Sequence, residues 1–515
     1  MPHARPHSAI PALSPAHPQP SGTRAEWVND VHSELNATLV AGVLRPRSID
    51  ELAGIVRAAR GAGRPLAIAG GRHAMGGQQF ATGELLVDMT HLDRVLALDL
   101  RRGVVEVEGG ILWPALVREL AALAGEGPGA WSIVQKQTGA DRLSLGGALS
   151  ANVHGRGLAL APIVGQIEAF TLVDAEGEVR ECSRGANREL FALAIGGYGL
   201  FGIVGRVRLR LAPRRRLVRE VELCEAGDLA RAFEARIAAG ALHGDFQFAI
   251  DPASDAFLRE GILCTYHPVA DATGVPAGQR ELDEGDWRRL LRLAHGDKTR
   301  AFREYAEHYL ATRGRVYSSD AHQLGTYVEG YHREIDAARR RARCLEGPAS
   351  EPRGSEVPAS ALRASEVIGE LFVPRAELSR FLELARADLR RLAADVIYGT
   401  VRLVEEDRES FLAWAREPWA CVVFNLCTPH TRAGRERTAR AFQALIARAR
   451  GLGGSFYLTY HRYATREQLE ACHPRLREFF RAKRELDPEG RFQSDGYRHH
   501  VRLLGLGPRM GGASS

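Results

Sequence analysis

Ala69–Phe80 reads AGGRHAMGGQQF and places one histidine, His73, between two pairs of glycines. Two further stretches are equally rich in glycine, SLGGALSANVHGRG at Ser144–Gly157 and GGYGLFGIVG at Gly196–Gly205. Glycine lets a backbone turn sharply and approach a ligand with bare N–H groups. One such turn is usually explained by tight packing alone. Three in one region favour an extended ligand that carries phosphate groups.

Short strands and one-sided helices surround these turns. Ser48–Glu51 has the spacing of a capping box and precedes a helical pattern that stops at Gly61 and Gly63. A second helix is predicted for WPALVRELAALAG and a third for NRELFALAIGG, and Glu176-Gly177 marks the turn of a hairpin. Predicted strands are PLAIAGG, LLVDM, VLALD, VVEVEGG, IEAFTLV and IVGRVRLRL. This mixture predicts an α+β domain at residues 23–213.

The second half of the chain reads as another α+β domain, at residues 214–455, with an antiparallel sheet. Long helical runs begin at Arg288 and Arg435, and strands are predicted for EVIGELFVPR, DVIYGTVRLV and WACVVFNLC. Residues 456–515 form a closing segment. Composition predicts a disordered leader at residues 1–22 and a mobile loop at residues 346–365, both rich in Pro and Ser.

The bulk properties exclude several classes of function. The net charge of +6 is spread among interleaved acidic residues, which argues against nucleic-acid binding, and the basic run Arg208–Glu220 reads as a solvated junction. The 7 cysteines form no CxxC pair, so we expect no metal site and a reducing, cytoplasmic setting. No apolar run has the length of a membrane span, and the oligomeric state stays open.

Gly197–Gly202 matches the GxGxxG pattern of dinucleotide-binding Rossmann turns. That motif requires a strand before the glycines and a helix after them, because the pyrophosphate sits on the helix N-terminus. Here a predicted helix precedes the glycines and a predicted strand follows. We therefore reject the Rossmann interpretation.

The three glycine-rich stretches, in this order and spacing, resemble the FAD-binding domain of the vanillyl-alcohol oxidase family, or p-cresol methylhydroxylase (PCMH) type, over Ala25–Pro213. The resemblance implies a two-part FAD-binding domain and FAD as the cofactor. The residues that it assigns to FAD are Gly70, Gly71, Arg72, His73, Ala74, Gly77, Gln78, Thr138, Gly139, Ser144, Gly146, Gly147, Ser150, Asn152, His154, Gly155, Gly202 and Ile203.

The resemblance also implies a covalent flavin. In families with a GHSxxGQ signature, such as cytokinin dehydrogenase, the histidine is bonded to the flavin 8α-methyl carbon. His73 falls on that position, with Ala74 in place of the serine and Gly77-Gln78 completing the pattern. The alternative is a histidine that only packs beside the flavin. No cysteine lies between His73 and Cys182, so a second link through a cysteine is not expected.

The C-terminal segment resembles sugar-lactone oxidases, alditol oxidase and decaprenylphosphoryl-ribose oxidase, with KRELDPEGRF at Lys483–Phe492 as the matching piece. That resemblance implies hydride transfer from a hydroxyl-bearing carbon to flavin N5, with a base and a cation nearby. Arg402 matches the arginine of a Glu-x-Arg pair in alditol oxidase, whereas Thr400 replaces the glutamate. This difference makes a plain alditol or aldonolactone a weaker candidate substrate.

The resemblance assigns three more catalytic candidates, Asn425, Tyr460 and His461. In a strand only one of the adjacent Tyr460 and His461 faces the flavin; we expect Tyr460 inward, although His461 is the better base. Each candidate also has a structural alternative: an ion pair at Arg402, a turn cap at Asn425 and an aromatic core strand at TYHRY.

Three functions fit these patterns. The first is an FAD-dependent oxidase or dehydrogenase that takes hydride from a sugar-like or polyol substrate and passes electrons to oxygen or another acceptor. The second is a flavin-dependent reductase or dehydrogenase of a lipid or sterol-like substrate. The third is a catalytically decayed flavin-binding partner protein, which the missing glutamate keeps open.

Overall fold

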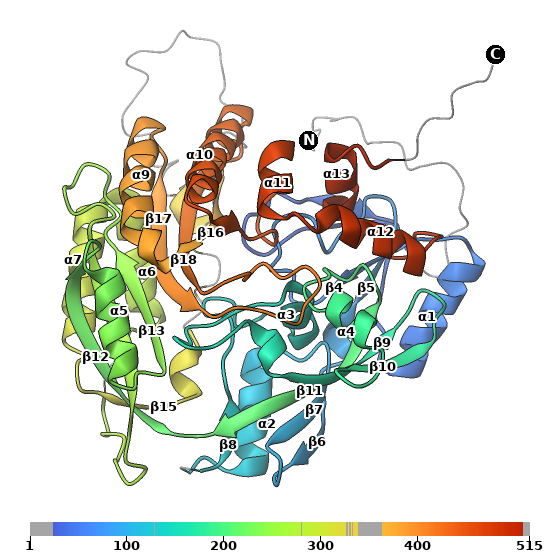
Figure 1. Cartoon of the computed structure of the whole chain (residues 1–515), viewed down its shortest axis with the longest axis horizontal. Helices are drawn as coiled ribbons and strands as arrows, with labels where there is room; N and C mark the ends of the chain where they lie inside the picture. The colour runs from blue at the N-terminus through green and yellow to red at the C-terminus, as the bar shows by residue number, and fades with distance from the viewer. Residues whose placement is uncertain are drawn as a thin grey trace, which may run out of the picture.

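A computed structural model describes residues 24–127, 129–279, 281–325, 328, 331, 333–337 and 363–507 of the chain. Figure 1 shows the sheets of the N-terminal half towards the bottom and right, and the large sheet of the second half at the left. The predicted leader at residues 1–22 and most of the predicted loop at residues 346–365 lie outside the described residues. Ala364 and Ser365 already belong to a strand, so that prediction extends too far at its end.

The first part of the chain forms a small parallel sheet and a two-stranded antiparallel sheet. The parallel sheet has the order β3 (Gly42–Leu44), β5 (Leu85–Asp88) and β4 (Leu66–Ala69), and the antiparallel pair is β1 (Glu26–Val28) with β2 (Thr38–Val40). Helix α1 (Ile49–Gly61) connects β3 to β4. Ser48 caps α1 by accepting the Glu51 N–H, but the Glu51 carboxylate accepts the N–H of Arg47, so only half of the predicted capping box forms.

A six-stranded antiparallel sheet follows. Its strands are β6 (Val95–Asp99), β7 (Val104–Glu108), β8 (Trp131–Ile133), β9 (Ile167–Val173), β10 (Val179–Ser183) and β11 (Ile203–Pro213). The helices between them are α2 (Trp113–Ala124), α3 (Leu145–Ala151) and α4 (Arg188–Ala194). The predicted hairpin is confirmed, because β9 pairs with β10 across Gly177, whose φ of 81° only glycine adopts readily.

The second half of the chain contributes an eight-stranded sheet in which all neighbouring strands are antiparallel. Its order is β15 (Val316–Ser318), β12 (Arg216–Glu225), β14 (Glu260–Val269), β13 (His243–Phe248), β17 (Val396–Val404), β18 (Trp419–Pro429), β16 (Ala364–Pro374) and β19 (Ser455–Phe456). The predicted α+β class and antiparallel sheet are confirmed. The division of the chain at residues 213 and 455 stays a prediction.

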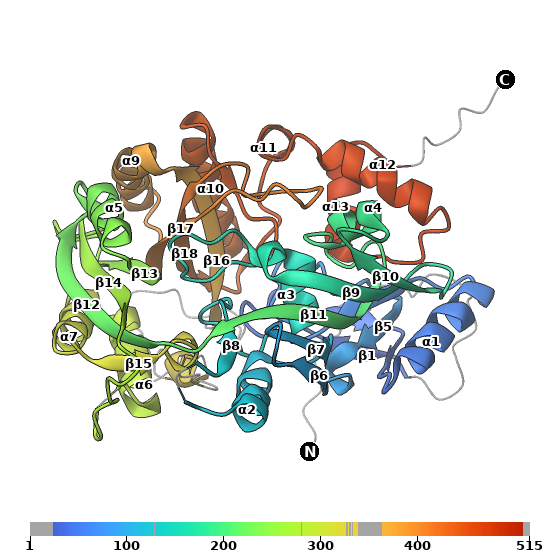
Figure 2. The same ribbon diagram turned by 60° about the horizontal axis from the view of Figure 1, so that its bottom comes forward.

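Helices cover the two faces of this sheet differently. The helices α5 (Leu229–Ala238), α9 (Leu378–Arg391) and α10 (Arg432–Gly451) share a large apolar core with one face. The helices α6 (Glu284–Gly296) and α7 (Lys298–Leu310) pack on the other face, where Tyr266 and Tyr305 are buried; in Figure 2 they lie below the sheet. The single long helical run predicted from Arg288 is therefore two helices, since Asp297 ends α6 and caps α7.

The C-terminal segment returns to the first part of the molecule. It contains α11 (Arg466–Cys472), α12 (Leu476–Leu486) and α13 (Asp495–Leu503), which lie above β4 and α3 in Figure 1. The backbone N–H of Leu66 donates to Arg491 at 2.7 Å, and that of Asp495 donates to Phe80 at 2.7 Å. The strand prediction for TYHRY is wrong. Strand β19 ends at Phe456, and residues 457–460 form a turn.

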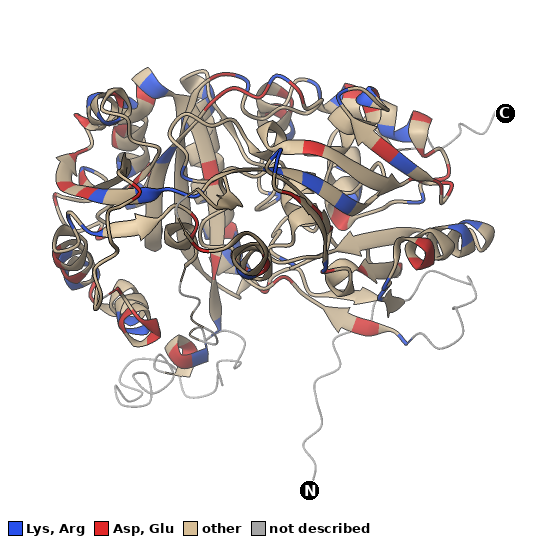
Figure 3. Cartoon of the chain, turned by 90° about the horizontal axis from the view of Figure 1, so that it is seen from below, with Lys and Arg blue, Asp and Glu red and all other residues tan. Residues whose placement is uncertain are grey.

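In Figure 3 the Lys and Arg positions are interspersed with Asp and Glu positions along the helices and strands. The arginines of the basic run from Arg208 follow this pattern: Arg208 pairs with Glu181, and Arg214 pairs with Asp320 at 3.0 Å. Among the described residues, no helix combines the length and apolar character needed to cross a membrane.

Candidate functional site

A cavity of about 710 Å³ lies between the glycine-rich turns and the eight-stranded sheet. One wall, the glycine-rich wall, is formed by the turns at residues 70–74, 138–147 and 199–204. The opposite wall, the sheet wall, is formed by cavity-facing side chains of β12–β14 and β16–β18. Predicted residues that line the cavity are Gly70, Gly71, Arg72, His73, Ala74, Gln78, Thr138, Gly139, Ser144, Gly146, Gly147, Ser150, Gly202, Ile203, Arg402, Asn425 and Tyr460.

Glycine is required in the glycine-rich wall because its turns press against one another. A Cβ on Gly70 would overlap Ser144 Oγ, and a Cβ on Gly71 would overlap the carbonyl oxygen of Arg142. Gly139, with a φ of 78°, instead has open space where its Cβ would stand. The wall therefore presents backbone to the cavity, as a long phosphate-bearing ligand needs.

His73 lies in this wall with a second histidine that the sequence analysis missed. His32 Nε2 is 2.7 Å from His73 Nδ1, and both rings line the cavity. Burial, together with His32, lowers the pKa of His73 to about 3. The imidazole of His73 is therefore neutral at neutral pH and keeps a nitrogen lone pair.

The turn that carries Thr138 and Gly139 is fixed from behind by a buried lysine. Lys136 is 1% exposed, pairs with Asp141 and donates to the carbonyl of Gln137 at 2.7 Å. In front of it, Thr138 Oγ1 and Gln137 Oε1 are buried without a hydrogen-bond partner among the described residues. Because unpaired buried polar atoms are rare, these two oxygens point to a polar ligand in the cavity.

Arg402 occupies the centre of the sheet wall. It faces the cavity from β17 together with Tyr398, whereas Val401 and Leu403 on the same strand pack into the core beneath the sheet. Arg402 is 5% exposed, and its Nε and Nη1 have no hydrogen-bond partner among the described residues. A buried guanidinium with free N–H groups indicates an oxygen-rich or anionic ligand.

Two carboxylates of the eight-stranded sheet, Glu370 and Asp245, pair with groups other than Arg402. Two side chains of the turn at His154–Arg156 reach these carboxylates. His154 contacts Glu370 on β16, and Arg156 Nη1 lies 3.3 Å from Asp245 Oδ1 on β13. Asp245 precedes Phe246, which pairs with Val401, so it lies beside Arg402. This arrangement leaves Arg402 available to a ligand.

The remaining catalytic candidates separate into two groups. Asn425 donates to Glu366 at 2.7 Å while its Oδ1 is unpartnered among the described residues, and Tyr460 accepts from Gln137 Nε2 at 3.3 Å. Both line the cavity. His461 does not: its ring lies 4.3 Å from that of Phe442, and burial lowers its pKa to about 3.

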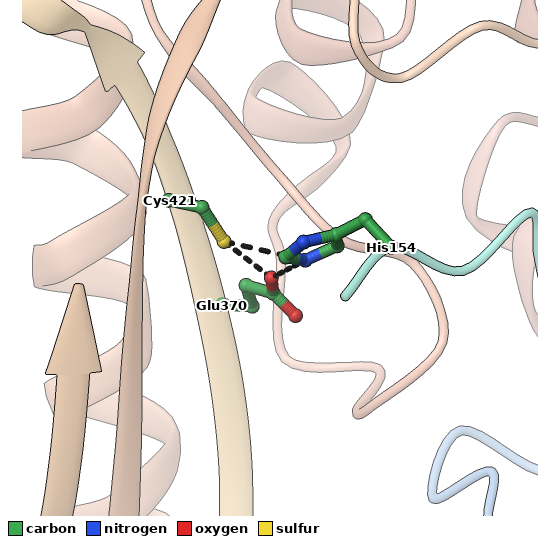
Figure 4. Close-up of side chains that lie close together, drawn as sticks. All are labelled: His154, Glu370 and Cys421. Atoms are coloured by element: carbon green, nitrogen blue, oxygen red, sulfur yellow. Dashed lines mark hydrogen bonds and ion pairs between the residues drawn. The ribbon is translucent and has the colours of Figure 1, made fainter. Parts of the chain in front are cut away.

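Four predicted cofactor residues also lie outside the cavity lining. Gly77 accepts the N–H of Gly496 at 2.9 Å, and Gly155 packs against the carbonyl of Lys136. Asn152 ends α3 in a left-handed conformation with φ of 51° and donates to Asp407 at 2.8 Å. His154 is turned away from the cavity into a buried cluster with Glu370 and Cys421 (Figure 4). These four positions shape the wall from behind.

The far end of the cavity is rich in tyrosine, which no local motif signalled. Arg219 is 5% exposed, with its guanidinium carbon 4.3 Å from the ring centre of Tyr317 and 5.3 Å from that of Tyr266. Aromatic faces of this kind stabilise a cation and also stack on sugars or planar rings. The side chains come from β12, β14, α7 and β15, which are distant in sequence; they are Arg219, Tyr266, Tyr305, Tyr309 and Tyr317.

Comparison with known proteins assigns a cofactor to the part of the chain that carries the first two turns of the glycine-rich wall. Residues 40–183 match the family model described as FAD binding domain. Cytokinin dehydrogenase 4 of Oryza sativa subsp. japonica is 34% identical over 195 residues, 36% of this chain and 36% of that protein. Cytokinin dehydrogenase 1 of Arabidopsis thaliana is 30% identical over 189 residues, 35% of this chain and 32% of that protein. The uncharacterized oxidoreductase ORF5 in the fasciation locus of Rhodococcoides fascians is 27% identical over 199 residues, 39% and 42% of the two chains.

The chain thus has an α+β, PCMH-type FAD-binding domain, and FAD is its cofactor. The matched region spans less than half of the length of each of these relatives. The residues present fit the cofactor: the glycine-rich wall offers backbone and the unpartnered Thr138 Oγ1, and Arg402 offers free guanidinium N–H groups. When bound, FAD supplies the site with a two-electron acceptor.

Proposed function

We propose that this protein is an FAD-dependent oxidoreductase that oxidises a hydroxyl-bearing carbon of a sugar-like or polyol substrate. The observation that carries the proposal is the position of Arg402, a buried guanidinium with unpartnered Nε and Nη1 in the same cavity as the glycine-rich wall. A cation held there favours negative charge on a reduced flavin, which lowers the barrier to hydride transfer.

Other side chains of the sheet wall suit a substrate rich in hydroxyl groups. Tyr460, Asn425 and Glu366 offer a phenol, an amide oxygen and a carboxylate at the centre of the cavity. The tyrosines at the far end give flat faces on which a sugar ring can stack. The resemblance of Lys483–Phe492 to sugar-lactone and alditol oxidases supports the same substrate class.

We further propose that His73 carries the flavin covalently. The neutral imidazole provides the lone pair for a bond to the flavin 8α-methyl carbon, which would replace one of its C–H bonds. That hydrogen would leave as a proton, and its two electrons would pass to the flavin ring and then to the electron acceptor that reoxidises it. His32, with Nε2 2.7 Å from His73 Nδ1, is placed to share the proton that His73 releases. Acid precipitation tests the link: the yellow colour stays with the pellet for the unmodified protein and moves to the supernatant for His73→Ala. Colour in the supernatant of the unmodified protein would remove the covalent bond from the proposal.

A second candidate substrate comes from the relatives, several of which are named cytokinin dehydrogenases. A planar ring system of the cytokinin kind could also stack on the tyrosines at the far end of the cavity. Anaerobic mixing of the holoenzyme with polyols, lactones, polyprenyl sugars and a cytokinin separates the candidates. We expect bleaching of the flavin absorbance by a hydroxyl substrate; bleaching by the cytokinin alone would favour the second candidate, and no bleaching would contradict both.

A further inference from the structure

A buried cluster of His154, Glu370 and Cys421 lies behind the cavity and is not part of its lining. Figure 4 shows the three side chains pointing towards one another from the turn after α3, from β16 and from β18. All three are at most 2% exposed. His154 Nε2 and Cys421 Sγ both contact Glu370 Oε1 and are 3.5 Å from each other.

The hydrogen bonds of His154 show that the cluster shares a proton. The carbonyl of Gly155, 3.2 Å from Nδ1, can only accept, so Nδ1 carries a hydrogen. If Nε2 and Glu370 both lacked a proton, a lone pair would face a carboxylate. One proton must therefore lie between His154 Nε2 and Glu370 Oε1, and the Cys421 thiol donates a second hydrogen bond to the same oxygen.

The cluster connects to the cavity through Tyr460. Gln137 Nε2 donates to the Tyr460 oxygen at 3.3 Å, so the phenolic hydrogen is free to point elsewhere. Tyr460 packs in the same buried cluster as Cys421, whose thiol donates to Glu370. The ring of Tyr460 lies 5.6 Å from that of Tyr457, whose backbone N–H donates to the Glu370 carbonyl at 3.0 Å. Burial, followed by the nearby Glu370, raises the pKa of Tyr460. Glu370 Oε2 has no hydrogen-bond partner among the described residues, so it is open to the phenolic proton.

We propose that Glu370 is a buried proton-accepting site that receives the substrate hydroxyl proton through Tyr460. The inference rests on the proposed function. As the substrate C–H bond breaks, its hydrogen and two electrons leave as hydride to the flavin. The substrate O–H proton passes to Tyr460, the phenolic proton passes to Glu370 Oε2, and the O–H electron pair becomes the second bond of the C=O product.

The charges around Glu370 explain when it accepts the proton. Burial alone would raise the pKa of Glu370, but His154 and Arg402 hold it below its ordinary value, so the resting carboxylate is ionised. Negative charge arriving beside Arg402 offsets that cation and increases the proton affinity of Glu370. The other ionisable groups that face Glu370 are Tyr457, Tyr460 and Cys421, all uncharged because burial raises each pKa well above its ordinary value.

The reduction potential of the flavin in the holoenzyme tests the site without any substrate. Reduction with dithionite against reference dyes, repeated across pH, counts the protons taken up with two electrons. Each proton changes the equilibrium tenfold per pH unit, which is about 30 mV for a two-electron couple. For the unmodified protein we expect the reduction equilibrium to change hundredfold per pH unit, because one proton binds to the flavin and one to Glu370. For Glu370→Gln we expect a tenfold change per pH unit. Glu377→Gln, a matched change just after β16 and outside the cavity lining, keeps the hundredfold dependence.

Two further comparisons separate this role from a structural one. Cys421→Ala removes a hydrogen bond to Glu370 and moves the upper pH limit of the hundredfold region up by about one unit, and Cys421→Ser restores it. Tyr460→Phe keeps the hundredfold dependence, because the site itself is intact, but slows flavin reduction by a bleaching substrate by about 100-fold. Flavin absorbance shows that each variant is a folded holoenzyme.

Equal pH dependence in the unmodified protein and Glu370→Gln would overturn the proposal. So would one zinc per chain by elemental analysis that Cys421→Ser removes, because the three side chains would then be metal ligands. Failure of every substrate in the bleaching panel would contradict the proposed function and leave the potential measurement valid. A tenfold dependence in the unmodified protein, together with bleaching, would contradict this inference alone.

Discussion

The glycine-rich wall and the sheet wall of the cavity offer a ligand different parts of the chain. The first offers backbone from turns that are close in sequence, and a Cβ at Gly70 or Gly71 would collide with its neighbours. The second offers side chains such as Arg402, Asn425 and Tyr266 from strands far apart in sequence. We infer that one wall holds the cofactor by shape and the other determines the chemistry by charge. The following predictions test this division.

The largest expected effect is at Arg402. Arg402→Met removes the guanidinium and should slow flavin reduction by about 10³-fold, or about 4 kcal/mol, while the flavin stays bound through the glycine-rich wall. Stopped-flow measurement of flavin bleaching gives the rate, and absorbance gives the flavin content. Arg437→Met, at an exposed position on α10, is the control. Loss of flavin from Arg402→Met would show that the sheet wall also holds the cofactor, which would contradict the inferred roles of the two walls.

The converse change is Gly71→Ala. Its Cβ would overlap the carbonyl oxygen of Arg142, so the two turns must separate, at a cost of about 1–3 kcal/mol. We expect most of the flavin to be lost on purification. Any flavin that remains should react at a nearly normal rate. Gly61→Ala, where nothing lies within 4 Å of the added atom, is the matched control. Full flavin content in Gly71→Ala would contradict the role of backbone shape.

The same contrast explains how much the sequence could predict. The glycine-rich wall was found because its residues lie in three short stretches, whose order and spacing are visible without knowing the fold. His154 and Arg156 are two residues apart, yet only the structure shows that they reach carboxylates on different strands. Arg219 and the tyrosines around it gave no signal, since they meet only when β12, β14 and β15 pair. Tyr460 lines the cavity and His461 does not, but they lie in and directly after a turn and not in the strand on which the expectation for this pair rested.

His461 supplies a prediction about pH. Its pKa in the folded chain is about 3, below the ordinary 6.5, because it is buried against Phe442 and Tyr463. As the pH falls below 6.5 the unfolded chain binds a proton that the folded chain does not, so stability is lost, by about 2 kcal/mol at pH 5. Urea unfolding gives the free energy of unfolding at pH 7 and at pH 5. The loss between these two pH values should be smaller for His461→Phe than for the unmodified protein, by about that amount. Exposed His91, changed to Phe, is the control; an unchanged difference in His461→Phe would contradict the buried neutral imidazole.

The smallest expected effect is at Thr400, which stands where alditol oxidase has a glutamate. Its hydroxyl donates to the carbonyl of Phe246 at 3.0 Å, so it joins β17 to β13 and is not part of the cavity lining. Thr400→Val should cost about 1 kcal/mol in urea unfolding and leave the rate of flavin reduction unchanged. A fall in that rate larger than about threefold, with flavin content intact, would mean that the hydroxyl reaches the substrate. The sheet wall would then include Thr400 as well as Tyr398 and Arg402, which flank it on β17.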